Sequence, residues 1–242
     1  MADGREPGAI PKNRQGLEIH SDGLGSEEWR RYQRAIRSLA AVAAEEVGRR
    51  MPVKPGARNM LDIGGSHGFY SVALCRRRPH LAAVILDLPE AIKEAAPILA
   101  MEGMGDRIRH QVGDALTPDL GENCYDLILI SNLAHHFTDE QNRGLMLRAA
   151  RALTPGGLLV MQELIRPASP KTGDQAGQVL NLFFALTSTS GCWSVPEIES
   201  WLRSASLEIR RPVWLRAMPG AAQVRGIATS RRQKVGLKSR AG

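Results

Sequence analysis

The sequence predicts an α/β fold with a doubly wound, mostly parallel sheet and an antiparallel strand pair at its C-terminal end. Three observations predict it. An apolar strand at 59–63 leads into a turn with three glycines, and a second apolar strand at 81–87 ends in the carboxylate of Asp87. Strand and helix patterns then alternate along the chain, as they do in crossover units of a parallel sheet. We therefore expect helices to cover both faces of one sheet.

The N-terminal part divides into two segments before the sheet begins. Residues 1–25 are rich in Gly, Pro and charge, which predicts a flexible arm. Apolar residues recur at helical spacing over 26–50, so we expect one long helix that packs on the following domain. That main domain is expected over 51–230, and a basic tail over 231–242.

Within the main domain, strands are expected at 59–63, 81–87, 107–112, 125–131 and 157–163. Helices are expected at 69–78, 90–102, 139–153 and 194–204. The run Leu127–Ile130 is apolar on both faces, as in a strand buried beneath helices on both sides. Two last strands, at 207–215 and 225–230, would form the antiparallel pair.

Composition limits the class of protein. The 242 residues are 43% hydrophobic, near the globular average, so a packed core is expected. No apolar run approaches the ~20 residues that cross a bilayer, so no membrane partner is expected. The polar N-terminus lacks the apolar segment of a signal peptide. Three cysteines without CxxC spacing fit a reduced, cytoplasmic protein and predict no metal site.

The net charge of +7 is unevenly placed. Residues 203–242 hold ten Lys or Arg and one acid, a balance of +9, so the preceding 202 residues carry about −2. Such an end is usually solvated. We expect no nucleic-acid partner, because no aromatic residue lies among the charges from Arg225 onward to stack on a base.

Polar residues follow the expected strands at their carboxyl ends, where ligands bind in an open parallel sheet. They are Asp62 to Gly68, Asp87, Gly113-Asp114, Ser131-Asn132 with His135-His136, and Glu163. The glycines allow a backbone to approach a ligand closely, and Asp87 could accept hydrogen bonds from a ribose diol. This spacing alone does not choose between a dinucleotide and S-adenosylmethionine.

Each of these residues also has a structural explanation. Asp87 could cap the helix that begins at Pro89-Glu90, and Asp114 could close the Gly113 turn through an Asx hydrogen bond. His135 and His136 could be ordinary surface residues. Their joint position on one edge of the sheet favours a functional site.

The combination of motifs resembles the class I, Rossmann-like S-adenosylmethionine-dependent methyltransferases. It is most similar to small-molecule O-methyltransferases of the caffeate and acetylserotonin type and their bacterial natural-product relatives. The motifs are Leu61-Asp-Ile-Gly-Gly-Ser-His-Gly68, Leu86-Asp-Leu-Pro-Glu90, Gly113-Asp114, Asn132-Leu-Ala-His-His-Phe-Thr-Asp-Glu140 and Ala152-Leu-Thr-Pro-Gly-Gly-Leu-Leu-Val-Met-Gln-Glu163.

The resemblance implies S-adenosyl-L-methionine as cofactor, S-adenosyl-L-homocysteine as product, and no metal. The methionine end would be held by Asp62, Gly64, Gly65, Ser66 and Gly68. The ribose hydroxyls would be held by Asp87, with Leu88 on the purine face. Asp114 and Ala115 would hold the adenine, and Ser131 would complete the cofactor set.

The resemblance also implies the chemistry. His135 would be the general base for a hydroxyl acceptor, a small aromatic or polyketide-like molecule, and Glu163 would orient it. His136 is the competing candidate for the base. The acceptor would contact Trp29, Tyr32, His136 and Phe183, and the alternative is that Trp29, Tyr32 and Phe183 are core residues.

This sequence departs from the family pattern in ways that leave alternatives open. A second carboxylate is expected near Cys192-Trp193, where neither residue is acidic. The family dimerises through an N-terminal winged-helix domain that is not visible here, so the chain would be a truncation or a minimal relative. N- or C-methylation by positioning, or a non-catalytic binding module, are the alternative functions.

Overall fold

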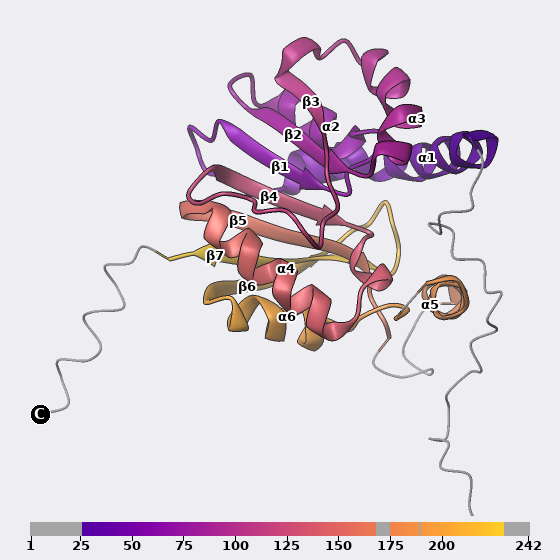
Figure 1. The fold of residues 1–242 in the computed structure, drawn as a ribbon. Coiled ribbons are helices and arrows are strands. Elements are labelled where there is room, and N and C mark those ends of the chain that lie inside the picture. The colour runs from indigo at the N-terminus through magenta and orange to yellow at the C-terminus, as the bar shows by residue number, and fades with distance from the viewer. Residues whose placement is uncertain (1–25, 168–174, 189, 230–242) are drawn as a thin grey trace, which may run out of the picture.

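The computed structural model describes residues 26–167, 175–188 and 190–229. Its centre is a seven-stranded sheet with the strand order β3-β2-β1-β4-β5-β7-β6 (Figure 1). Strands β1 to β5 are parallel, and β7 pairs antiparallel with both β5 and β6. The strand bounds are β1 (Asn59–Ile63), β2 (Ala82–Asp87), β3 (Ile108–Val112), β4 (Tyr125–Ser131), β5 (Leu153–Leu164), β6 (Leu207–Trp214) and β7 (Ala221–Ala228). This is the doubly wound, mostly parallel sheet that the sequence predicts.

Helices cover both faces of the sheet. One layer holds α1 (Ser26–Arg50), α2 (Phe69–Arg77) and α3 (Pro89–Ala100), and the other holds α4 (Asp139–Ala152) and α6 (Val195–Ser204). Helix α5 (Gln175–Thr187) lies beyond the edge where the parallel strands end (Figure 1). Two short 3-10 turns complete the elements, η1 (Gly105–Arg107) and η2 (Ala134–His136).

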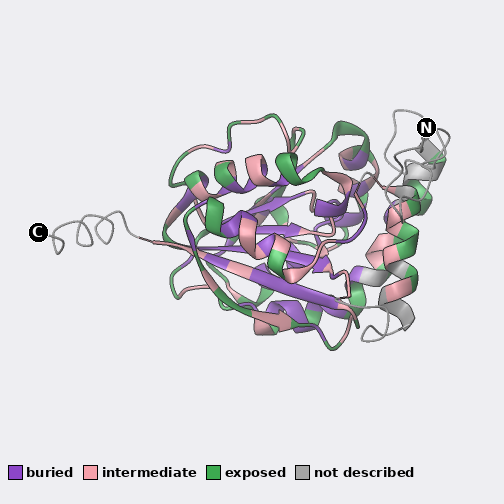
Figure 2. Cartoon of the chain, turned by 90° about the horizontal axis from the view of Figure 1, so that it is seen from below, coloured by how far each residue is buried: buried purple, intermediate pink, exposed green. Residues whose placement is uncertain are grey.

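The central strands divide the core by alternation. In β4, Leu127 and Leu129 pack in the cluster beneath α1 and α2, whereas Ile128 and Ile130 pack beneath α4 and α6. All four are fully buried, because neighbouring side chains of a strand point to opposite faces and both faces are covered. Figure 2 shows these buried strands between helices whose outer sides are exposed.

Three predictions of elements were wrong or incomplete. Helix α5 was not predicted. Strand β5 begins at Leu153 and not at 157, with a register shift against β4, because the chain is already extended at the end of α4. The last strand runs over 221–228 and not 225–230, since its pairing with β5 extends back to Leu164.

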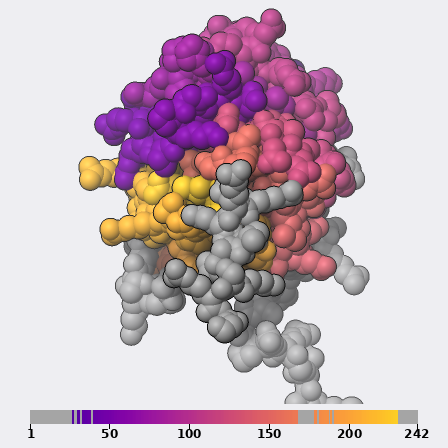
Figure 3. Space-filling view, turned by 90° about the vertical axis from the view of Figure 1, so that its left-hand side faces the viewer, coloured from indigo at the N-terminus to yellow at the C-terminus, as the bar shows by residue number. Residues whose placement is uncertain are grey.

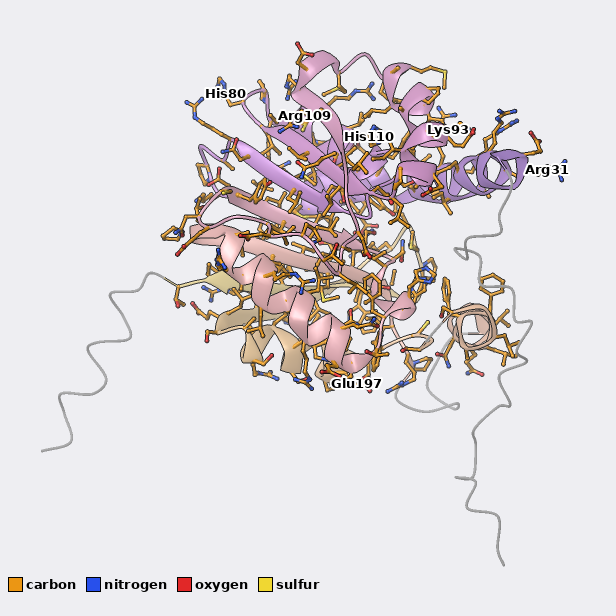
Figure 4. All side chains as sticks on the ribbon, viewed as in Figure 1. Arg31, His80, Lys93, Arg109, His110 and Glu197 are labelled. Atoms are coloured by element: carbon orange, nitrogen blue, oxygen red, sulfur yellow. The ribbon has the colours of Figure 1, made fainter. Side chains whose placement is uncertain are left out.

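Local sequence fixes the helix starts on the α4–α6 face. Thr138 and Gln141 form a capping box at α4, and Ser194 and Glu197 form another at α6. Glu197, labelled in Figure 4, also receives two hydrogen bonds of 2.6 and 2.7 Å from Arg166, which follows β5. These contacts hold the end of β5 against the start of α6. Among the residues described, no helix is both long and apolar enough to cross a membrane.

Candidate active site

A pocket of about 550 Å³ lies at the carboxyl ends of β1, β2 and β4. It brings together residues that are far apart in the sequence. Of the predicted site residues, its wall contains Asp62, Gly64, Gly65, Ser66, Asp87, Leu88, Asp114, Ala115, Ser131, His135, His136 and Phe183. Gly68 and Glu163 do not line it. The side chains of Trp29 and Tyr32, like residues 1–25 and 231–242, lie outside what the structure describes.

The glycine turn after β1 needs at least two of its glycines for steric reasons. A Cβ on Gly65 would lie 2.4 Å from Cγ of Asp62, and a Cβ on Gly64, where φ is +69°, would lie 2.9 Å from the Leu133 side chain. Ser66 also has a positive φ of 52°. The turn therefore forms a cradle with its backbone open to the pocket.

Gly68 has a different place from the one we predicted. It is the N-cap of α2 with φ 73°, and a Cβ there would lie 2.6 Å from Cδ1 of Ile85. Gly68 thus lets the helix approach β2 closely and does not form the pocket wall.

Asp62 is the buried acid at the base of the pocket, with 1% exposure. Its Oδ2 accepts a hydrogen bond of 2.6 Å from the Ser71 hydroxyl, while its Oδ1 is buried without a partner. Burial, and then the charge of Asp87, raise the pKa of Asp62 to about 7, against the lowering effect of Ser71. An unpartnered carboxylate oxygen at a pocket suits a cationic ligand group.

Asp87 ends β2 and ties it to the glycine turn. Its Oδ2 accepts the N–H of Ser66 and its Oδ1 accepts the N–H of Leu88, both at 2.8 Å. Asp87 does not cap α3, whose N-cap is Leu88 without a side-chain hydrogen bond. Burial raises the pKa of Asp87, partly opposed by these two hydrogen bonds. Each oxygen keeps a lone pair for a hydroxyl donor.

Asp114 combines a structural contact with its place at the pocket. Its Oδ1 accepts the N–H of Leu116 at 2.9 Å, an Asx turn, while the residue remains exposed. Leu88, 36% exposed, presents an apolar side chain to the same cavity. This part of the wall offers an apolar surface and a carboxylate edge.

His135 also lines the pocket, and it forms a buried pair with Glu163. His135 lies in η2 after β4, is 3% exposed, and places Nδ1 3.2 Å from Oε2 of Glu163, at the end of β5. Oε1 of Glu163 accepts the N–H groups of Leu133 at 2.7 Å and Ala134 at 2.8 Å. Since an ionised carboxylate only accepts, it selects the imidazole tautomer with the proton on Nδ1 and leaves Nε2 as the basic atom.

The backbone of this turn is held from outside as well. Trp193 Nε1 donates to the carbonyl of Ala134 at 2.9 Å, and Asn142 Nδ2 donates to the same oxygen at 3.0 Å. The N–H of Ser190 donates to the carbonyl of His135 at 3.1 Å. Trp193, one of the two residues near which the resemblance predicts an acid, therefore contacts the backbone next to His135.

Cys192, the neighbour of Trp193, is a buried thiol near Glu163. Burial, and then the negative charge of Glu163, raise its pKa to about 12. The thiol is therefore neutral near pH 7.

Aromatic rings surround His135. Phe184 packs on its ring at a centroid distance of 4.0 Å, and His136 lies at 4.1 Å. Phe183, 44% exposed, meets Phe184 edge-on, so α5 carries two rings to this side of the pocket. These rings give a planar apolar ligand a surface on which to stack.

Several residues near the cofactor side were not predicted. His110 Nε2 lies 2.8 Å from the carbonyl of Ser66, and Gln33 of α1, 1% exposed, accepts the Ser66 hydroxyl. Figure 4 labels His110, on β3. Burial lowers the pKa of His67 in the same turn to about 4, so His67 is neutral near pH 7. No motif marks Gln33 or His110, because their contacts arise only when α1 and β3 pack on the turn.

No cluster of three or more His, Cys, Asp or Glu side chains that could hold a metal ion occurs within the described part of the chain.

Comparison with known proteins gives a consistent result. The family model for an O-methyltransferase domain matches residues 12–203. Among curated proteins, the chain is similar to 3-hydroxy-5-methyl-1-naphthoate 3-O-methyltransferase of Streptomyces sahachiroi, with 31% identity over 170 residues, covering 69% of this chain and 47% of the relative. N,N-dimethyltransferase OxyT of Streptomyces rimosus is 27% identical over 202 residues, covering 81% of this chain and 58% of the relative. The chain spans about half the length of these curated relatives.

Solved structures show the same fold. An O-methyltransferase family 2 protein from Planctomyces limnophilus, in complex with apigenin, matches with a TM-score of 0.75 and 23% identity, over 86% of this chain and 63% of that one. An O-methyltransferase family protein from Burkholderia thailandensis matches with a TM-score of 0.77 and 19% identity, over 89% and 64%.

Proposed function

Because the chain belongs to the O-methyltransferase domain family, we propose that it transfers a methyl group from S-adenosylmethionine to a hydroxyl of a small molecule. The acceptor is aromatic or polyketide-like, and His135 is the general base. The observation that carries the proposal is that His135, which lines the pocket together with the glycine cradle, Asp62 and Asp87, is paired with the buried carboxylate of Glu163.

The residues of the cradle suit this cofactor. The free Oδ1 of Asp62 would accept a hydrogen bond from the ammonium group of the cofactor. Asp87 would accept hydrogen bonds from the ribose hydroxyls. Leu88, Asp114 and Ala115 would hold the adenine. When bound, S-adenosylmethionine supplies a methyl group on a positively charged sulfur.

His135 and Glu163 would handle the proton. A phenol has a pKa of about 10 and is mostly neutral near pH 7, so it needs a base. Nε2 of His135 would take the hydroxyl proton. Glu163, which contacts Nδ1 of the same ring, would stabilise the positive charge of the resulting imidazolium. Phe183 and Phe184 would hold the ring of the acceptor so that its oxygen is in line with the methyl group and the sulfur of the cofactor.

The acceptor class is supported by the chemistry of the wall and by the relatives. The naphthoate 3-O-methyltransferase of S. sahachiroi acts on an aromatic hydroxyl by its name, and an O-methyltransferase structure was obtained with apigenin. A second candidate is N- or C-methylation, because similar relatives include an N,N-dimethyltransferase and an L-tyrosine C(3)-methyltransferase. In that case His135 would only position the acceptor.

The test is calorimetry with S-adenosylmethionine and S-adenosylhomocysteine, followed by methyl transfer to a panel of naphthols, flavonoids and anilines. We expect both cofactor forms to bind and hydroxyl acceptors to be methylated. Absence of cofactor binding to the folded chain would reject the proposal. Methylation of anilines alone would select the second candidate.

A further inference from the structure

A second pocket, of about 380 Å³, lies at the opposite end of the sheet from the candidate active site. It is formed by the segment after α1, the start of β5, and the strands β6 and β7. These are the amino ends of the parallel strands, whereas the cofactor cradle follows their carboxyl ends. Figure 3 looks onto this end, where the indigo and purple residues of α1 and its following segment meet the yellow residues of β6 and β7.

This pocket is lined by cationic and by apolar side chains. The cations are Lys54, Arg210, Arg211 and Arg225, and we call their site the arginine pocket. Pro52, Leu158 and Ile227 are its apolar lining residues, and no carboxylate is among the described residues that line it.

The strand pairing shows why three arginines gather here. Arg210 and Arg225 are direct cross-strand partners in the antiparallel pair of β6 and β7, an arrangement in which like charges repel. After Arg210 the register shifts, so that Arg211 and Pro212 together oppose a single residue of β7. This bulge leaves both Arg210 and Arg211 exposed and lining one pocket, although successive strand residues normally point to opposite faces.

The charges are only partly compensated. Lys54 pairs with Asp126 at 2.8 Å, and Arg210 pairs with Glu208 at 2.9 Å. Within the described ranges, neither Arg211 nor Arg225 has an acidic partner. Arg225 donates from Nη2 to the carbonyl of Arg211 at 2.6 Å, but its Nε is buried without a hydrogen-bond partner. An uncompensated guanidinium with a buried free donor is costly unless an anion receives it.

We propose that the arginine pocket binds a phosphate group, either free or as the ester of a small organic molecule. The fork of a guanidinium matches the oxygens of phosphate, and three arginines line this site. In an ester, the organic part would lie on Pro52, Leu158 and Ile227. The site is separate from the cofactor cradle, so the inference does not depend on the methyl-transfer proposal.

The experiment is isothermal titration calorimetry of the full chain with phenyl phosphate and with inorganic phosphate, at one ionic strength. The variants are Arg211→Gln, which changes an exposed residue, and the double variant with Arg225→Gln. Arg109→Gln is the matched control, since Arg109 is an exposed arginine on the far outer strand β3 (Figure 4). Thermal melting followed by circular dichroism checks that each variant is folded.

We expect the wild type and Arg109→Gln to bind equally, Arg211→Gln to bind about 10-fold more weakly, and the double variant to lose more. Tighter binding of phenyl phosphate identifies an ester as the ligand, and equal binding identifies free phosphate. Unchanged affinity in folded variants would overturn the proposal. So would failure of both probes to bind while the same substitutions weaken binding of a single-stranded RNA oligomer, because the patch would then serve nucleic acid.

Discussion

Oε2 of Glu163 lies 3.2 Å from Nδ1 of His135, while Oε1 of the same carboxylate receives the backbone N–H groups of Leu133 and Ala134. One buried side chain therefore fixes both the imidazole ring and the turn that carries it. Because Glu163 comes from β5 and His135 follows β4, two adjacent parallel strands set this geometry.

Glu163→Gln should lower turnover about 100-fold while the affinity for S-adenosylhomocysteine stays within twofold. A glutamine can still accept the two backbone N–H groups through its oxygen. Its amide nitrogen would then face Nδ1 of His135 and favour the wrong tautomer. Steady-state kinetics and calorimetry measure the two effects. Glu140→Gln, on the exposed first turn of α4, is the control, and equal turnover of both variants would contradict the role of Glu163.

The neighbouring histidines can be separated by substitution. His135→Ala should lower turnover by about 100-fold or more, whereas His136→Ala should change it less than about 10-fold, because Nδ1 of the buried His135 lies beside the carboxylate of Glu163, which can stabilise its charged form. Single-turnover methyl transfer with saturating cofactor measures this difference. If His136→Ala were the more damaging variant, the assignment of the base would have to be exchanged.

Trp193 is expected to position His135 through the carbonyl of Ala134. Trp193→Phe removes the 2.9 Å hydrogen bond from Nε1 to the carbonyl oxygen of Ala134, while the hydrogen bond from Asn142 to that oxygen remains. We therefore expect the free energy of unfolding to fall by about 1 kcal/mol. Turnover should fall about 3- to 10-fold, with KM for the acceptor little changed. Trp214→Phe, at a side chain 54% exposed, is the control. Equal effects on kcat from both tryptophans would show that Trp193 has no positioning role.

The cofactor cradle should not tolerate a side chain at Gly65. In Gly65→Ala, the new Cβ would lie 2.4 Å from Cγ of Asp62, and the turn must move to accommodate it. We expect affinity for S-adenosylhomocysteine to fall by about 10-fold or more. Gly144→Ala in α4 is the matched control, because a Cβ there makes only an ordinary contact of 3.5 Å and alanine is the better helix former. Calorimetry that finds both variants equally competent would place the cofactor elsewhere.

The sequence predicts the sheet well because the central strands are short, continuous apolar runs that only a doubly covered sheet can bury. The polar residues at the strand ends could also be identified, since a parallel sheet brings its carboxyl ends to one edge. Helix α5 was missed although Val179, Leu182, Phe183 and Leu186 recur at helical spacing. We interpreted Phe183 only as an acceptor contact or a core residue and did not test this spacing for a helix, and in the structure these side chains are largely exposed.

Other parts of the site could not be predicted from local sequence. Gln33 reaches Ser66 from α1, His110 reaches the same residue from β3, and Trp193 reaches Ala134 from the segment before α6. Each contact joins residues at least 33 positions apart in the chain, through the packing of whole elements. Gly68 was assigned to the pocket from its motif, but the requirement for glycine there comes from the approach of α2 to β2.

Cofactor binding should release a proton from Asp62. Burial raises the pKa of Asp62 to about 7, well above the 3.8 of a free side chain, so the empty site holds this carboxyl partly protonated at neutral pH. In the unfolded chain Asp62 binds this proton less tightly, so protonated Asp62 adds to the free energy of unfolding. This contribution is fully present below pH 3.8 and is lost as the pH rises through about 7. A bound ammonium group lowers the pKa of Asp62, because its positive charge stabilises the carboxylate form, and it thereby offsets this loss of stability.

The affinity for S-adenosylhomocysteine should therefore increase as the pH rises from 5.5 to about 7, and then level off. Calorimetry at pH 6.0 in two buffers of different ionisation enthalpy should show net proton release on binding. In Asp62→Asn, which retains the shape of the side chain, that release should disappear and the affinity should fall about 10-fold or more. If the wild type released no proton while still binding tightly, the ammonium group would not be paired with Asp62. The free Oδ1 of Asp62 would then need a different partner.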